Sequence, residues 1–302
     1  RRSTVSDWMK MEQDRGISIS SAALQFEYRD TVINLIDTPG HADFSEDTYR
    51  VLSSVDLTIM LVDAAKGLET QTMKLFDVCK HREIPTITVI NKWDRPGIDA
   101  LELMDEIVQR TGMVPTPLTW PVGQSGDFRG VLNREDGTYT KFTRTDGGAT
   151  IAGEETMDAG AAEELEGDAW TNAVDESDLL ELEDQNYDEE SFLAGRTTPV
   201  MFASAVLNFG VHKILDTLVD IAPPAHARID VDGNPREVDA PFSGFVFKVQ
   251  AGMDTNHRDR LAYVRVCSGV FERGMVVTHA ATGKPFATKY AQQVFGRDRE
   301  VI

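Results

Sequence analysis

Length, composition and charge exclude several classes of protein. The chain has 302 residues, 41% of them hydrophobic and 26% charged, which is typical of soluble globular domains and long enough for one large and one small domain. No apolar run approaches the roughly 20 residues that cross a bilayer and no signal peptide opens the chain, so we expect a soluble, cytoplasmic protein without a membrane partner.

The charge is negative and unevenly distributed. A net charge of −20 argues against DNA as a partner, because phosphate backbones attract Lys and Arg. Sixteen carboxylates lie between Glu154 and Glu190, and we interpret them as a solvated helical face or a partly ordered loop rather than a metal site. The two cysteines, Cys79 and Cys267, match no metal-ligand spacing and are expected to be reduced thiols.

Strand-like and helix-like patterns alternate along the first two thirds of the chain. Short apolar runs predict buried strands, and stretches with helical spacing lie between them. The alternation predicts an α/β fold with one doubly wound parallel sheet. The predicted strands cover residues 31–36, 57–62, 86–90 and 200–203, and the predicted helices cover 44–52, 69–80, 100–111 and 211–221.

The alternation is interrupted by about a hundred residues, between 95 and 198. That length is too great for a simple helical crossover. We therefore expect an acidic subdomain, at about residues 125–197, inserted into a nucleotide-binding domain of residues 1–222.

A second domain is expected after a linker. Residues 223–239 contain three prolines and a glycine and have linker composition. In residues 240–302, Phe245, Phe247 and Val249 alternate with other residues as in a strand. The pattern predicts an antiparallel β-barrel that is incomplete, because the segment holds too few strands to close one.

The first polar motif follows a predicted strand directly. It is the run Asp37-Thr38-Pro39-Gly40-His41. An Asp at a strand end can hold Mg²⁺ through water, and Gly40 lets its backbone N–H approach a terminal phosphate. An ordinary turn is the alternative interpretation of this run taken alone.

The second motif, Asn91-Lys92-Trp93-Asp94, also follows an apolar strand. Asp94 can accept hydrogen bonds from the N1–H and the exocyclic amine of guanine, and the stem of Lys92 can cover the ring. Adenine presents the wrong edge, and a site of this kind discriminates by roughly 10⁴. Taken alone, this short motif could instead be a surface turn.

The third motif is Ser204-Ala205, at the end of the last predicted strand. A backbone N–H here could meet the guanine O6. The pair is weak evidence by itself. Because ligands of doubly wound sheets bind at the carboxyl ends of the strands, the three motifs together predict one pocket for GTP or GDP with Mg²⁺.

These motifs resemble those of the translational GTPases. The run Arg15-Gly16-Ile17-Ser18-Ile19 looks like the first switch loop of that family, where a hydroxyl, usually of Thr, ligates Mg²⁺. The resemblance gives Ser18 that role beside Asp37. It also implies that His41 helps to position the water that attacks the γ-phosphate, and that Ile17 belongs to an apolar gate beside it.

Longer stretches, at residues 7–12, 44–50 and 119–123, resemble the branch of the family that acts in translation termination. The similarity covers nearly the whole chain and is weakest at 154–190. It implies a GTPase that binds the ribosome, through rRNA and ribosomal proteins, and promotes dissociation of codon-reading release factors. The alternatives are a GTPase like elongation factor G, and a ribosome-binding module insensitive to nucleotide.

The phosphate loop GxxxxGK[ST] of such GTPases does not occur in the sequence. We therefore expect a P-loop-type GTPase sheet that is truncated on its N-terminal side, with hydrolysis by the parent protein and not by this chain alone. A basic cluster in the second domain is either a ribosome-facing surface or a set of solvated strand positions. It consists of Arg258, Arg260, Arg265 and Arg273.

Overall fold

Residues 22–38, 45–143, 153–251, 260–288, 292–295 and 298–301 are described by the computed structural model. Asp56–Ala222 form one unit, and Arg1–Val55 with Pro223–Ile302 form another. Within the described ranges, no helix combines the length and the apolar composition needed to cross a membrane.

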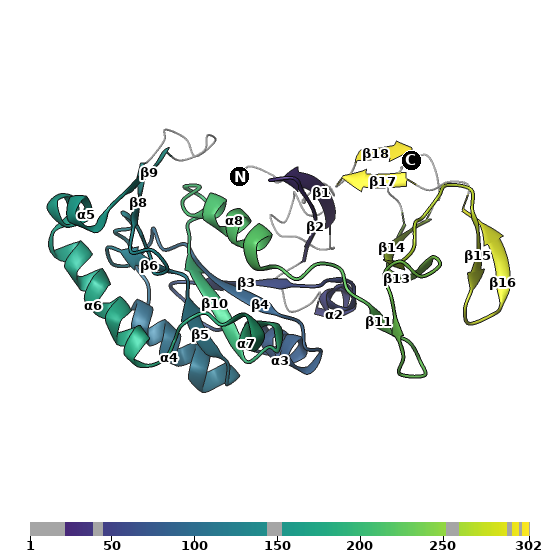
Figure 1. The fold of residues 1–302 in the computed structure, drawn as a ribbon, viewed down its shortest axis with the longest axis horizontal. Helices are drawn as coiled ribbons and strands as arrows, with labels where there is room; N and C mark the ends of the chain where they lie inside the picture. The colour runs from purple at the N-terminus through teal and green to yellow at the C-terminus, as the bar shows by residue number, and fades with distance from the viewer. Residues whose placement is uncertain are drawn as a thin grey trace. The chain divides into compact units, whose positions relative to one another are not determined.

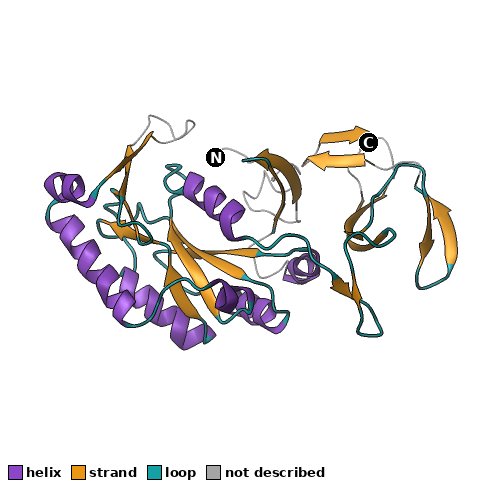
Figure 2. Cartoon of the chain, in the orientation of Figure 1, coloured by secondary structure: helices purple, strands orange, loops and turns teal. Residues whose placement is uncertain are grey.

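A parallel sheet forms the centre of the 56–222 unit (Figures 1 and 2). Three of its strands confirm predicted ones. The fourth was not predicted, because its sequence Val-Pro-Thr-Pro is untypical of a strand; it lies at the sheet edge, where proline is tolerated. In spatial order the strands are β3 (Thr58–Asp63), β4 (Thr86–Asn91), β10 (Thr197–Phe202) and β5 (Val114–Pro117).

Helices cover both faces of this sheet, as a doubly wound fold requires. The helices α3 (Thr70–His81), α4 (Ala100–Thr111) and α8 (Val211–Ile221) confirm three predicted ranges. The sequence limits α4 at both ends, because the Asp99 side chain caps its first N–H groups and Gly112 ends it at φ 66°. Figure 1 shows α8 on the opposite side of the sheet from α3 and α4.

The core of the sheet is apolar and contains a group of hydrogen-bonded threonines. On one face, Ile87 and Met201 are buried and pack with apolar side chains of α8. Between the strands, the Thr198 hydroxyl donates to the Thr86 carbonyl at 2.7 Å and lies 2.8 Å from the Thr88 hydroxyl. Because buried polar groups are costly only when unpaired, these threonines fit the interior.

In the described residues, the insertion contains three helices and most of an antiparallel sheet whose first strand precedes residue 125. The sheet contains the strands β6 (Thr119–Val122), β7 (Gly130–Asn133), β8 (Tyr139–Thr143) and β9 (Gly153–Met157). The helices are α5 (Ala159–Glu166), α6 (Asp168–Leu182) and α7 (Glu189–Leu193). The acidic segment is therefore largely helical, and in the described part of the chain no group of His, Cys, Asp or Glu is arranged to hold a metal ion.

The longest acidic helix is anchored to the inserted sheet by buried polar contacts. The indole N–H of Trp120 donates to Glu176 of α6 at 2.7 Å. The guanidinium of Arg134 donates to the Ser177 hydroxyl of α6 at 3.0 Å and to the Gln185 carbonyl, just after α6, at 2.9 Å. These bonds fix one face of α6 and leave its other carboxylates to solvent.

We expect Glu176→Gln to stabilise the protein at pH 7. Burial raises the pKa of Glu176, and the hydrogen bond from Trp120 offsets this only in part. When the pKa of a carboxyl is higher in the folded than in the unfolded state, the protein's free energy of unfolding falls as pH rises above the unfolded-state pKa. The amide keeps an acceptor for Trp120 without the charge, so the variant should unfold at higher urea than the wild type at pH 7. That advantage should shrink towards pH 4, and an unchanged difference at the two pH values would contradict this.

In the other unit, the predicted strand at 31–36 is present but pairs differently from the prediction. The strand β2 (Thr31–Asp37) forms an antiparallel hairpin with β1 (Ala22–Tyr28) instead of joining the parallel sheet. Its connection is a two-residue turn in which Arg29 and Asp30 have φ of 48° and 57°. Two successive positive φ values match the twist of a hairpin, and our sequence interpretation overlooked this turn. The helix predicted at 44–52 is confirmed as α2 (Ser45–Val51), followed by the 3₁₀ turn η2 (Leu52–Ser54).

One antiparallel strand pair lies within the predicted linker and others follow it, and those that follow it confirm the predicted antiparallel class of the C-terminal segment. The Arg265 guanidinium donates to the carbonyl of Ser54 at 2.9 Å, so part of its hydrogen-bonding capacity is used within the unit. Cys267 is a free thiol, as is Cys79. The pairs are β11 (Arg228–Ile229) with β12 (Pro235–Arg236), β13 (Ser243–Ala251) with β14 (Arg260–Ser268), β15 (Val276–His279) with β16 (Lys284–Ala287), and β17 (Gln292–Phe295) with β18 (Asp298–Val301).

Candidate functional site

Loops that leave β3, β4 and β10 meet at one edge of the parallel sheet. Asp63 and Asn91 are paired in the β3–β4 register, and Ile90 is paired with Phe202 across β4 and β10. Backbone hydrogen bonds continue past the strand ends. The N–H of Trp93 donates to the Ala203 carbonyl at 3.2 Å. The predicted convergence of the second and third motifs is therefore present in the structure.

Asn91 joins these two motifs through its side chain. Its Oδ1 accepts from the N–H of Lys92 at 2.8 Å and from the N–H of Ala205 at 3.1 Å. Lys92 has a φ of 66°, an uncommon conformation for a residue with a side chain. Strained backbone of this kind persists where the surroundings enforce it, often at functional sites.

Asp94 has a carboxylate oxygen in need of a donor. The side chain is 13% exposed, and its Oδ2 lies 3.9 Å from Nε of Arg95. Its Oδ1 is buried and receives no hydrogen bond from the part of the chain that the structure describes. A buried acceptor without a partner costs about 1 to 3 kcal/mol, and more when charged. A ligand that presents N–H donors would remove this cost, and the Watson–Crick edge of guanine does so.

Lys92 reaches back to the strand beside its own. Its ammonium lies 2.5 Å from Oδ2 of Asp63, whose other oxygen accepts from the N–H of Ala65 at 3.0 Å. Burial alone would raise the pKa of Asp63, but the hydrogen bonds from Lys92 and Ala65 and the charges of Lys92 and Lys66 together hold it below its usual value. Our sequence interpretation missed Asp63, although it follows an apolar run just as Asp37 and Asn91 do.

The loop after β10 is closed by its own backbone. Ser204 and Phe209 exchange two hydrogen bonds of 3.0 Å, and Ser204 is buried. The N–H of Ala205 is directed to Asn91, so a base O6 would share this donor or use another N–H of the loop. The role of Ser204 and Ala205 toward O6 stays a prediction.

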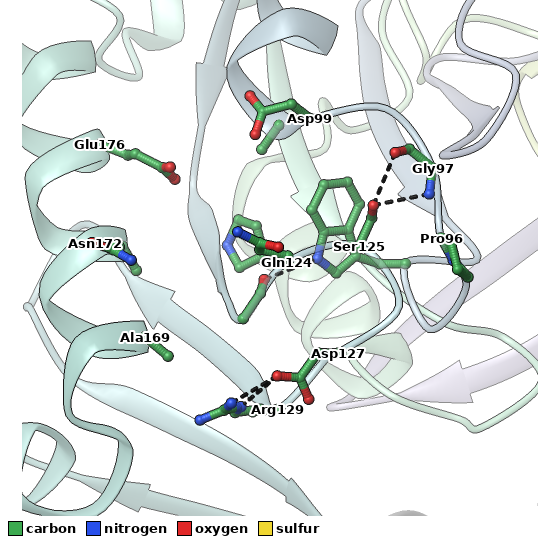
Figure 3. A pocket seen from close by; sticks show the side chains of 15 residues that line it. Pro96, Gly97, Asp99, Gln124, Ser125, Asp127, Arg129, Ala169, Asn172 and Glu176 are labelled. Carbon is green, nitrogen blue, oxygen red and sulfur yellow. Dashed lines mark hydrogen bonds and ion pairs between the residues drawn. The ribbon is translucent and has the colours of Figure 1, made fainter.

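Trp93 connects the loop of residues 91–94, the candidate base loop, to the insertion. It is 2% exposed, its ring centroid lies 4.9 Å from that of Phe202, and its indole N–H donates to the Gly123 carbonyl at 3.4 Å. Behind it is a cavity of about 630 Å³, where the Ser125 hydroxyl bridges the N–H and carbonyl of Gly97 (Figure 3). Of the four residues in the motif only Trp93 lines this cavity. Since Asn91, Lys92 and Asp94 do not line it, the cavity is not the candidate base site.

The phosphate side of the predicted site is described only in part. Asp37 ends β2 and Thr38 follows it, and both belong to the 1–55 segment. Ile17, Ser18, Pro39, Gly40 and His41 lie outside the described residues. The metal and catalytic assignments therefore stay predictions.

Matches to models of known protein families show which family the chain belongs to. Residues 1–224 match the family model of the elongation factor Tu GTP-binding domain. The chain belongs to this family of translational GTPases. Residues 241–302 of this translational GTPase match the model of elongation factor G domain 2.

Curated relatives of this translational GTPase are named peptide chain release factor 3. This chain is 48% identical over 305 residues to the protein of that name from Synechococcus elongatus. It is 49% identical over 306 residues to the one from Synechocystis sp.. The matches cover 100% of this chain but 55% and 56% of the relatives, so the chain spans about half of their length. The resemblance stated from the sequence is confirmed.

A solved structure has the same fold. It is a crystal structure of a protein from Thermus thermophilus, with a TM-score of 0.76 over 99% of this chain and 44% of that one. The two sequences are 20% identical, so the likeness concerns the fold alone.

Proposed function

We propose that the chain is part of a release factor 3 that hydrolyses GTP to GDP and phosphate on the ribosome. It would promote dissociation of codon-reading release factors, act in the cytoplasm, and use neither a membrane nor DNA. The buried, unpaired Oδ1 of Asp94 beside the joined loops of Asn91 and Ala205 supports guanine binding. The identity to proteins named release factor 3 supports the termination role.

The proposed domain division follows the same evidence. Residues 1–222 form the GTP-binding domain with its insertion at about 125–197, residues 223–239 form the linker, and residues 240–302 belong to the barrel domain. The matched ranges, 1–224 and 241–302, support this division.

The side chains have separate roles in this proposal. Asp94 reads the guanine edge, the stem of Lys92 covers the ring, and Asn91 holds the two loops together. Asp37 and Ser18 would hold Mg²⁺, which neutralises charge on the phosphate oxygens when bound. Thr38, Pro39 and Gly40 would present backbone to the terminal phosphate, and His41 would orient the attacking water beside Ile17.

Ribosome-dependent hydrolysis by the full-length protein tests the proposal. Phosphoryl transfer depends on positioning more than on covalent chemistry, so we expect ribosomes to stimulate multiple-turnover hydrolysis strongly. His41→Ala should lower the stimulated rate by about 10²-fold, as misplacement of a reacting group does, and leave GDP affinity unchanged. The absence of ribosome stimulation would count against the proposal.

The chain alone should bind GTP poorly. Without a glycine-rich phosphate loop it lacks donors worth about 1.5 to 3 kcal/mol for each hydrogen bond to a charged group. Micromolar GTP affinity of the isolated chain, measured by calorimetry, would overturn this part of the proposal.

A GTPase that moves tRNA, as elongation factor G does, is the second candidate. The match of residues 241–302 to elongation factor G domain 2 favours it. Assays with the full-length protein separate the two, since one activity releases a codon-reading factor after peptide release and the other advances tRNA.

A further inference from the structure

Asp63 and Lys92 form an ion pair between two loops of the candidate site. The contact of 2.5 Å joins the end of β3 to the loop after β4, and the Asp63 side chain is 18% exposed. A charged pair of this length is stronger than a neutral hydrogen bond. It restrains a lysine whose long side chain has many accessible rotamers when free.

The conformation of Lys92 explains why such a restraint matters. Its positive φ turns the side chain back across the ends of neighbouring strands, and the ammonium meets Asp63. With its tip held, the four-carbon stem has a defined path, and an apolar stem can lie against a planar ring. A restrained stem loses less conformational entropy when a ligand arrives.

The position of Asp63 is itself fixed from two sides. Its Oδ1 accepts from the N–H of Ala65, and its carbonyl accepts from the N–H groups of Lys66 at 3.0 Å and Gly67 at 2.9 Å. These bonds leave Oδ2 for Lys92. The carboxylate is therefore a rigid anchor and not a mobile surface charge.

We propose that Asp63 is a positioning residue of the nucleotide site, which anchors the Lys92 ammonium so that the lysine stem is preorganised against the guanine ring. This inference rests on the proposed function. It adds a residue that the second motif does not contain, and it assigns Asp63 to affinity and not to the choice of base.

The substitution Asp63→Asn in the full-length protein tests this directly. Asparagine keeps the oxygen that accepts from Ala65 and removes the charge that holds Lys92. We expect GDP affinity to fall about tenfold, the effect of one charge-assisted contact. The ratio of GDP to IDP affinities should stay as in the wild type, because IDP lacks only the amine that Asp94 reads.

A double-mutant cycle separates positioning from a general structural effect. Lys92→Met should also weaken GDP binding about tenfold, and the double variant should be no weaker than either single variant. Glu69→Gln is the matched control, because Glu69 pairs with Lys66 of the same loop at 3.1 Å but both side chains are more than half exposed. It should leave affinity unchanged.

The outcomes distinguish the anchoring role of Asp63 from the proposed function. If the wild-type protein binds GDP and Asp63→Asn binds it equally well, the anchoring role is wrong. The role is also wrong if Asp63→Asn weakens binding as much in the Lys92→Met background as in the wild type. If the wild-type protein does not bind GDP, the proposed function itself fails.

Discussion

Asp94→Asn in the full-length protein should lower GDP affinity by about 10³-fold or more and should create affinity for xanthosine diphosphate. The carboxylate accepts two hydrogen bonds from guanine, and sites with buried polar groups reject mismatched partners by roughly 10⁴. Xanthine has a carbonyl where guanine has its amine, so the asparagine amide can donate to it. Competition against a fluorescent nucleotide measures both affinities.

A surface carboxylate supplies the control for this experiment. Asp105 is exposed on α4, and Asp105→Asn makes the same change of charge away from the site. It should bind GDP as the wild type does. If Asp94→Asn also kept wild-type affinity for GDP, Asp94 would not read the base.

Phe202→Ala should cause the largest loss of stability, about 3 to 5 kcal/mol in the free energy of unfolding, as is typical when a buried phenyl ring is removed. Phe202 is 2% exposed, and its ring meets Trp93 at 4.9 Å and Trp120 at 5.4 Å, both edge to face. One side chain therefore supports the base loop and the inserted sheet together. Urea unfolding of the full-length protein, followed by tryptophan fluorescence, measures the loss.

Leu182→Ala is the matched control in the same unit. Leu182 is 85% exposed at the end of α6, so its truncation should change the unfolding midpoint little. A loss below about 1 kcal/mol for Phe202→Ala, similar to a surface change, would show that the aromatic contacts carry little stability. It would also remove the proposed support of the base loop by the core.

Periodicity was sufficient to predict the elements that position the site. The strands β4 and β10 read as apolar runs because they are buried on both faces, and α4 and α8 show helical spacing. The rule that ligands bind at the carboxyl ends of such strands then placed Asn91 and Ser204 together.

Contacts between segments that are distant in sequence could not be predicted in this way. The bond from Ala205 to Asn91 and the bond from Trp93 to Gly123 depend on how loops pack after folding. The partner of β2 depends on a turn made by Arg29 and Asp30, whose residue types give a weak turn signal. Asp63 shows that the strand-end rule would have found more had it been applied to every strand.

A crystal structure of the full-length protein with GDP and Mg²⁺ tests the central claim most directly. The account predicts guanine with its N1 and exocyclic amine within about 3 Å of the Asp94 carboxylate, the usual hydrogen-bond distance, and with the Lys92 stem along the ring. Guanine bound away from the loops that follow β4 and β10 would contradict it.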